Sequence, residues 1–545
     1  MTASTHQSRG AELDPAGELL GQPVPGENLV ENHLAHMFRA TVANHGFRPA
    51  TRVRQGDEWI IRTYAETGRR VAGLARAFVT PGLLTEDGLQ RGDRISLFSG
   101  NCPEWIEADL AGMTIGVVPV PIYPTSTPDQ IVHIVTDAGV RVIVAAGPKE
   151  LGRILEARDQ MPGLEAVILL DPADQVGDQD GLTVLSLDQV RQAGVSEEMQ
   201  GVVEERMGQS CADDVAALIY TSGTTGQPKG VMISHRAALA ELQALDAFFD
   251  VTPADHSLSF LPLSHALEWG WSMVVIRHGC LNTFVPNPKT ISTMLAEVRP
   301  TLFVSVPKLY EQVMKVAREK VSDSPAKLKA FEWSMQVGRE WWQAQQEGRR
   351  PSASLRARHG IADRLVLKAI RDAVGGPKTV LAAGGAPLRK EVEEFFAACG
   401  LLVCQGYGLT EASPLVSFNS PGEYKFGTAG KPLVGSEITT TEEGEILYRS
   451  LNIMKGYWKA PEATAAAIED GWLHTGDIGH IDEDGFLVIT DRLKDIIVTL
   501  NGKNISPQPI EDSLMKDPLF EHAVLLGDNR PCPVSYTHLT LPTKA

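Results

Sequence analysis

The stretch YTSGTTGQPKGVMISH, residues 220–235, constrains this chain more than any other part of its sequence. The run VAALIY at residues 215–220 is apolar and rich in strand-forming side chains, so we expect a strand that leads into a loop. In the loop, glycines let the backbone approach a ligand while hydroxyl and amide groups point at it. Lys229 adds a mobile positive charge, and Pro228 stiffens the turn that carries it. The residues expected to contact phosphate are Thr221, Ser222, Gly223, Thr224, Thr225 and Gly226.

The main rival for such a loop is the Walker A motif, which needs Gly, four residues, then Gly-Lys-Ser/Thr. That spacing fails here, because Pro228 stands five residues after Gly223 and Gly230 follows Lys229. An ordinary Ser/Gly loop is the plain alternative, and the density of the pattern beside a strand disfavours it. The motif resembles the phosphate-binding loop of the adenylate-forming superfamily, which includes acyl-CoA synthetases, luciferases and peptide-synthetase adenylation domains.

Composition bounds the class of protein. With 545 residues the chain exceeds one ordinary core, so several subdomains are expected. A net charge of -18 argues against a nucleic-acid partner. The six cysteines are scattered without a CxxC pair, and no stretch has the pattern of a signal peptide or a membrane span. We therefore expect a cytoplasmic protein, with peripheral membrane association left open, and a flexible polar tail over residues 1–30.

Residues 93–147 alternate strand-like runs (RISLF, VVPVPI, VRVIVAA) with helical ones, which is the pattern of a parallel sheet. One helix should begin near Pro128, capped by Ser126 or Thr127. Its buried face should hold Ile131, Ile134, Val135 and Ala138. His133 falls off that face, so we expect it to be solvated.

The run LPLSH ends at His265, and Glu268 completes an HxxE pattern that lacks a third metal ligand. In the superfamily resemblance, the position of His265 lies near the carboxylate of the acyl substrate. Trp269 and Trp271 follow on the same predicted helix. Their rings would line an acyl tunnel or pack as ordinary core, and the sequence does not separate the two.

A long helical region is predicted from about residue 309 to 375, with apolar stripes that include Leu328 and Phe331. This region is dense in Lys and Arg, unlike the acidic chain around it. The basic side chains would form a solvated face, or they would contact anionic lipid or the phosphates of CoA. A helical insertion at this place resembles the long-chain members of the acyl-CoA synthetase family.

Two further motifs carry nucleotide chemistry. In QGYGLTE, Tyr407 offers a ring to stack on a purine, Thr410 a hydroxyl for phosphate, and Glu411 a hard oxygen ligand for Mg²⁺. In GWLHTGD, Asp477 could accept hydrogen bonds from both ribose hydroxyls. Both motifs match the family order, which implies catalytic roles for Thr410, Glu411, Lys229 and His265. It also implies nucleotide contacts from Gly384, Gly385, Ala386, Gln405, Gly406, Tyr407, Gly408 and Asp477.

The stretch DRLKDIIVTLNGKNISPQPIE, residues 491–511, resembles the hinge of the family. The resemblance makes Asp491 the pivot, Arg492 a ribose contact, and the loop around Gly502 an approach to the pantetheine channel. We expect an AMP-binding domain over residues 31–490 and part of a mobile C-terminal α+β domain over 491–530. We expect residues 531–545 to be a foreign tail on a C-terminally truncated chain, because the family continues beyond the hinge to a motif with a catalytic lysine.

The resemblance implies an adenylate-forming α/β fold: two parallel α/β subdomains, a small β-barrel-like subdomain, then the hinge. It implies a long-chain fatty acid-CoA ligase that uses a fatty acid, ATP and coenzyme A as substrates and Mg²⁺ as cofactor. Two alternatives stay open, namely a fatty acyl-AMP ligase that loads a carrier protein, and a nucleotide or acyl binding protein without full turnover. The oligomeric state is not predicted.

Overall fold

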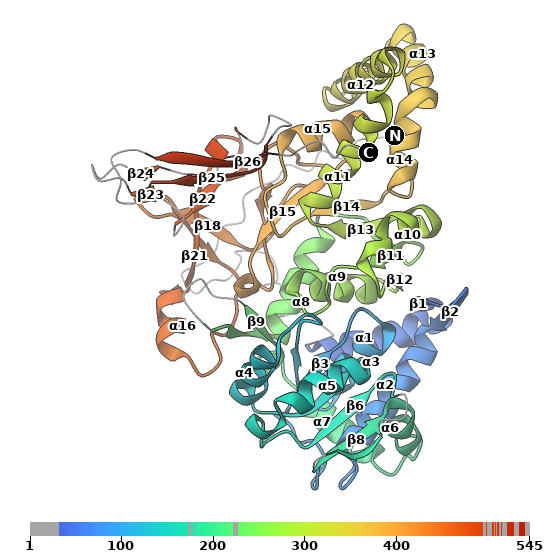
Figure 1. Cartoon of the computed structure of the whole chain (residues 1–545), viewed down its shortest axis with the longest axis vertical. Helices are drawn as coiled ribbons and strands as arrows, with labels where there is room; N and C mark the ends of the chain where they lie inside the picture. Colours follow the sequence, from blue (N-terminus) through green and yellow to red (C-terminus); the bar gives the residue numbers. More distant parts are fainter. Residues whose placement is uncertain are drawn as a thin grey trace.

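The structure is a computed structural model, and it describes residues 32–172, 176–179, 181–221 and 227–493. Beyond these it describes 497–498, 504–505, 507, 510–511, 514, 520–527 and 533–539. The molecule is elongated, with one α/β layer at the bottom of Figure 1, a second above it, and helices at the top. A smaller antiparallel sheet lies beside the second layer.

The lower layer is a six-stranded sheet in the order β4-β3-β5-β6-β8-β7, parallel except for its edge strand β7. Its central strands β3, β5 and β6 are mostly buried apolar runs, as expected for a parallel sheet covered by helices, whereas the edge strand β7 is polar and mostly exposed. The strands are β3 (Arg94–Phe98), β4 (Val118–Pro121), β5 (Val140–Ala145), β6 (Ala166–Leu169), β7 (Gly177–Gln179) and β8 (Leu182–Ser186). The helices are α2 (Tyr64–Val79), α3 (Pro103–Thr114), α4 (Pro128–Ala138), α5 (Pro148–Glu156), α6 (Leu187–Ala193) and α7 (Gln200–Gly208).

Helix α4 shows how local chemistry fixes these elements. Thr127 is the N-cap, whose side chain accepts a hydrogen bond from Gln130 N, and Gln130 Oε1 accepts one from Thr127 N at 3.0 Å, which completes a capping box. Pro128 occupies the first turn, and Gly139 ends the helix in the left-handed conformation. The four apolar residues predicted for its inner face are all buried. The cap, the start and the buried face of this helix are therefore confirmed.

The second layer is a nine-stranded sheet in the order β17-β16-β15-β14-β13-β11-β12-β1-β2. Its central strands are parallel, and antiparallel pairs close both edges. The strands are β1 (Pro49–Gln55), β2 (Glu58–Thr63), β11 (His256–Ser259), β12 (Leu281–Phe284), β13 (Leu302–Ser305), β14 (Val380–Ala383), β15 (Cys404–Gly408), β16 (Leu415–Phe418) and β17 (Lys431–Pro432). The helices are α1 (Leu34–His45), α8 (His235–Asp246), α9 (Ala266–Arg277), α10 (Ile291–Val298) and α15 (Lys390–Ala398).

The predicted helical insertion stands at the top of the molecule (Figure 1). Phe331 is buried as predicted, but Leu328 is exposed, because that end of its helix turns away from the core. No helix in the described part of the chain is both long enough and apolar enough to cross a membrane. The elements are α11 (Pro307–Ser322), α12 (Pro325–Gln346), α13 (Ala353–Ala362), a π-helical turn (Asp363–Leu367) and α14 (Lys368–Ala373).

Short strands and tight turns follow, as the sequence predicts, and they form a five-stranded antiparallel sheet. Its strands are β18 (Glu437–Thr440), β19 (Glu445–Arg449), β20 (Ile468–Glu469), β21 (Trp472–Ile481) and β22 (Leu487–Arg492), with α16 (Pro461–Ala467) between them. Past the hinge, β25 (Phe520–Leu526) pairs antiparallel with β26 (Val534–Leu539). Two short strands, β23 (Ile497–Val498) and β24 (Asn504–Ile505), also pair there.

Candidate active site

The predicted phosphate loop connects the two strands of a hairpin. Strand β9 (Val215–Thr221) pairs antiparallel with β10 (Lys229–Ser234), and Lys229 lies directly opposite Thr221. The predicted contacts Ser222, Gly223, Thr224, Thr225 and Gly226 lie outside the described residues. The hairpin therefore fixes where the loop starts and where its lysine stands.

His133 does not sit free in solvent, which corrects the expectation from sequence. Its Nε2 lies 2.8 Å from the carbonyl oxygen of Pro228, and its ring packs edge-on against Tyr220. The ring is half-buried, because α4 passes beside the hairpin. His133 thus ties the end of the phosphate loop to the lower α/β layer.

Several predicted site residues line one pocket at the carboxyl ends of β14 and β15, the sheet edge where α/β folds bind ligands. His265 caps α9 at the rim, where its Nδ1 accepts a hydrogen bond from Leu267 N at 3.2 Å. Leu409 and Phe418 are among its apolar lining residues. The predicted residues that line it are His265, Gly384, Gly385, Gly406, Gly408 and Thr410. Ala386 is exposed on the loop after β14.

Two of these glycines are required by close packing. A Cβ on Gly408 would lie 1.8 Å from the carbonyl oxygen of Pro414, and a Cβ on Gly406 would lie 2.6 Å from the ring of Phe418. Gln405 acts on the backbone instead, because its Oε1 accepts a hydrogen bond from Leu388 N at 3.0 Å. The two glycines therefore allow close packing along the pocket because they have no side chain, and Gln405 holds the neighbouring turn at Leu388 in place.

Tyr407 and Asp477 meet although they are 70 residues apart. The Tyr407 hydroxyl donates a hydrogen bond to Asp477 Oδ2 at 2.6 Å. Burial and the neighbouring carboxylate raise the pKa of Tyr407 well above its usual value, so it stays a donor. Arg492 Nε lies 3.4 Å from Asp477 Oδ1, because β21 and β22 pair these two residues. Tyr407, predicted to stack on the purine, is thus a neighbour of Asp477 and Arg492, which are predicted to contact the ribose.

Glu411 is held by a residue that the sequence analysis did not select. The Tyr457 hydroxyl donates to Glu411 Oε1 at 2.8 Å, and Met454 N donates to the Glu411 carbonyl oxygen at the same distance. The Lys229 ammonium lies 5.1 Å from the centre of the Tyr457 ring, within cation–π range. The two predicted charges of the site, from β10 and from the loop after β15, therefore share one aromatic neighbour.

These residues fit a magnesium ion that arrives with a nucleotide. Mg²⁺ usually takes one or two carboxylates together with phosphate oxygens and waters. Glu411 is half-buried and offers such a carboxylate. Within the described residues, no group of three or more His, Cys, Asp or Glu side chains could form a protein cage for a metal. His265 and Glu268 accordingly belong to no metal cluster there.

Both tryptophans of α9 are buried. Trp269 Nε1 donates to Asp109 Oδ2 at 3.0 Å, and Trp271 Nε1 donates to Ser257 Oγ at 2.9 Å. Each indole packs in one of the large apolar cores, so ordinary core packing describes both.

Asn452 is a further residue that sequence reasoning missed: its amide donates to the carbonyl oxygens of Ala412 and Leu415, both at 2.7 Å. No motif singles it out.

The predicted pivot Asp491 is buried at the end of β22, and its Oδ1 accepts a hydrogen bond from Arg492 N at 2.7 Å. Gly502 lies outside the described residues. Arg492 itself is exposed, as a contact to an incoming ligand would require.

Comparison with known proteins identifies the family of this chain. The family model for the AMP-binding enzyme matches residues 38–458, and the model for the AMP-binding enzyme C-terminal domain matches residues 494–536. The chain belongs to the AMP-binding enzyme family.

Named relatives are about one-third identical. A long-chain-fatty-acid–CoA ligase of Mycobacterium tuberculosis, FadD15, is 34% identical over 475 residues, which cover 87% of this chain and 76% of that protein. A long-chain-fatty-acid–CoA ligase of Xenopus laevis, ACSBG2, is 30% identical over 540 residues, covering 95% of this chain and 71% of that protein.

Solved structures share the fold. An anthranilate CoA ligase, AuaEII, solved with anthranoyl-AMP, superposes with a TM-score of 0.71 at 19% identity, covering 94% of this chain and 88% of the other. A fatty acyl CoA synthetase of Mycobacterium tuberculosis gives 0.63 at 21% identity, covering 93% and 88%. The predicted adenylate-forming α/β fold is confirmed.

Proposed function

We propose that this chain is an ATP-dependent acid-thiol ligase that activates long-chain fatty acids. The observation that carries the proposal is that predicted site residues from distant segments meet in two pairs: Lys229 and Glu411 share Tyr457, and Tyr407 donates to Asp477. The names of the relatives support the fatty acid as substrate and CoA as acceptor.

In the first step, a carboxylate oxygen of the fatty acid attacks the α-phosphorus of ATP. The bond to the β-phosphate breaks, and pyrophosphate leaves an acyl-adenylate behind. Lys229 stabilises charge that develops on the phosphate oxygens, and Glu411 would hold Mg²⁺, which neutralises part of that charge when bound. In the second step, the CoA thiolate attacks the acyl carbon, AMP leaves, and the thioester forms.

We propose that acids of twelve carbons or more are preferred. Each buried CH₂ contributes about 0.8 kcal/mol, so an acyl site that buries the whole chain should favour a long chain over a short one. The test is palmitate-dependent exchange of pyrophosphate into ATP, followed by palmitoyl-CoA formation, compared with octanoate and benzoate. Exchange that peaks with short or aryl acids would reject the long-chain assignment. Exchange without CoA-dependent release would favour a carrier protein as acceptor, and ATP binding without exchange would favour a binding protein.

We also propose a cytoplasmic location with peripheral contact to anionic lipid through the surface of α13 and α14. The exposed side chains Ile361 and Leu365 lie one helical turn apart, and Arg364 and Lys368 form a parallel exposed row. Vesicles with 30% anionic lipid should sediment the protein, and Arg364→Glu with Lys368→Glu should release it. Lys315→Glu with Lys320→Glu, which makes the same change of charge at two exposed positions of α11, is the control. Equal sedimentation of the wild type and the Arg364→Glu, Lys368→Glu double variant would reject this surface.

A further inference from the structure

The segment of residues 454–458 runs along β10 as an extra edge of the phosphate-loop hairpin. Met232 N donates to Gly456 O at 3.0 Å, and Trp458 N donates to Gly230 O at 2.7 Å. Val231 and Tyr457 form an antiparallel bridge. The position of residue 457 is therefore fixed relative to the lysine that begins β10.

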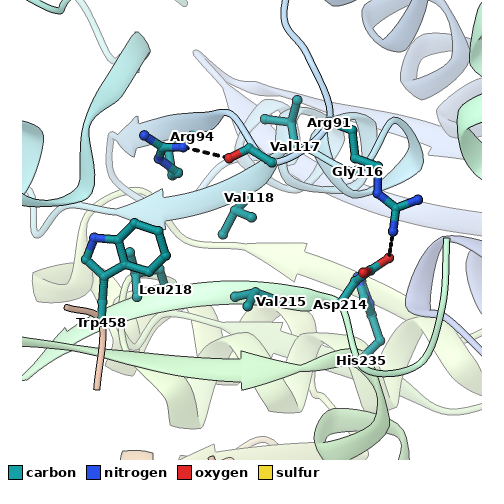
Figure 2. A pocket seen from close by; sticks show the side chains of 11 residues that line it. Arg91, Arg94, Gly116, Val117, Val118, Asp214, Val215, Leu218, His235 and Trp458 are labelled. Atoms are coloured by element: carbon teal, nitrogen blue, oxygen red, sulfur yellow. Dashed lines mark hydrogen bonds and ion pairs between the residues drawn. The ribbon is translucent and has the colours of Figure 1, made fainter. Parts of the chain in front are cut away.

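Neighbouring side chains of this extended segment serve opposite faces, as in any strand. Trp458 points into a pocket between the hairpin and the lower sheet, beside Leu218 and Val118 (Figure 2). Its Nε1 donates to the carbonyl oxygen of Asp137 at 3.0 Å, which anchors the segment to the end of α4. Tyr457 contacts Glu411 and Lys229 instead.

We infer that Tyr457 is a positioning residue of the adenylation site, which holds the Glu411 carboxylate toward the metal with its hydroxyl and supports the Lys229 ammonium with its ring. The 2.8 Å hydrogen bond occupies Oε1 of Glu411 and fixes the plane of the carboxylate, so that Oε2 is directed by the protein before any ligand binds. A preorganised carboxylate loses less conformational entropy when a cation binds.

The state of the tyrosine suits this role. A tyrosine hydroxyl has an ordinary pKa of about 10, so it is protonated at neutral pH and can donate to Glu411. The ring also excludes water from one side of the ammonium, which strengthens the attraction between Lys229 and its π face. One side chain thus fixes two charges that come from different segments.

This inference rests on the proposed ATP chemistry, and it is tested on ATP binding as well as on turnover. Calorimetry would measure the dissociation constant of ATP in EDTA and in 5 mM Mg²⁺ for the wild type, Tyr457→Phe and Trp458→Phe. For Tyr457→Phe, we expect unchanged affinity in EDTA and a gain from Mg²⁺ that is smaller by about tenfold, the size expected for one hydrogen bond to a charged group. Trp458→Phe removes a hydrogen bond from the same segment but should keep the full gain.

Tyr457→Leu separates the ring from the hydroxyl. Because it also removes the π face under Lys229, ATP affinity in EDTA should fall about two- to fivefold, which Tyr457→Phe should not cause. The inference would be overturned if Mg²⁺ increased the ATP affinity of Tyr457→Phe as much as that of the wild type, or if Trp458→Phe lost as much of this increase as Tyr457→Phe. Neither outcome would affect pyrophosphate exchange by the wild type, so the proposed function would stand. A wild type without acid-dependent exchange would instead remove the proposed function, and the inference with it.

Discussion

The hydroxyl of Tyr407 and the carboxylate of Asp477 are joined by a 2.6 Å hydrogen bond across two subdomains. Tyr407 comes from β15 of the large sheet and Asp477 from β21 of the small one. A bond of this length to an ionised acceptor is of the strong, charge-assisted kind. The residues expected to bind purine and ribose are therefore held in register before a nucleotide enters.

Asp477→Ala should weaken ATP binding about 10- to 100-fold, because hydrogen bonds to a charged group contribute roughly 1.5–3 kcal/mol. Titration calorimetry measures the dissociation constant directly. Glu483→Ala removes an exposed carboxylate from the turn that follows β21 and is the matched control for net charge. Equal ATP affinity in Asp477→Ala and Glu483→Ala would take Asp477 out of the nucleotide site.

Glu411→Gln should reduce the rate of adenylation roughly 100-fold, whereas the affinity for ATP in Mg²⁺ should fall only about tenfold, as in Tyr457→Phe. The amide keeps a hydrogen-bond acceptor for Tyr457 but lacks the negative charge that Mg²⁺ requires, and this matters most where charge develops at phosphorus. Pyrophosphate exchange at saturating ATP measures the rate. Glu443→Gln, on an exposed turn, is the control. An unchanged kcat in Glu411→Gln would rule out a role in the chemical step.

Local patterns predicted the elements and most of the pocket. The capping signal at Thr127 and the apolar spacing after it depend on a few adjacent residues, so the start and the buried face of α4 could be predicted from the sequence. The family order predicts Gly406 and Gly408 as nucleotide contacts, and the structure places both in β15 along the pocket, where a Cβ would clash with Phe418 or Pro414.

Contacts between segments far apart in the sequence could not be predicted from local patterns. Tyr457 lies 46 residues after Glu411, and its hydroxyl reaches that carboxylate only because residues 454–458 pair with β10. His133 meets Pro228 across 95 residues for a similar reason. The helical spacing of apolar residues placed His133 off the buried face of α4. It could not show that the hairpin of the phosphate loop packs against the side of α4 that carries His133.

Asp109 predicts a specific pH dependence of stability. It is buried beside Trp269, and burial raises its pKa from 3.8 to about 8. The folded state therefore holds this proton up to about pH 8, whereas the unfolded state releases it near pH 4, so stability falls as pH rises between these values. In Asp109→Asn this contribution disappears.

The free energy of unfolding of Asp109→Asn, relative to wild type, should accordingly rise with pH by up to about 1.4 kcal/mol per unit between pH 5 and 8. Urea unfolding of both proteins at several pH values measures the difference. Asp57→Asn, a fully exposed carboxylate, should give a flat difference. A flat difference for Asp109→Asn would mean that Asp109 is ionised in the folded protein.

The last prediction concerns Glu107, which is fully buried among three arginines, one from β2 of the upper sheet and two from helices of the lower layer. Its carboxylate lies 3.0 Å from Arg62, 2.8 Å from Arg70 and 2.8 Å from Arg191, so that α3, β2, α2 and α6 are joined at one point. Because removing Glu107 leaves three partly buried arginines with Glu104 as their shared acidic partner, Glu107→Ala should lower the free energy of unfolding by about 3 kcal/mol, the lower end for a broken buried pair. Glu204→Ala breaks an exposed pair with Arg39 and should cost less than about 1 kcal/mol. Chemical denaturation of both variants measures the contrast, and comparable small losses would show that the buried cluster contributes no more than a surface pair.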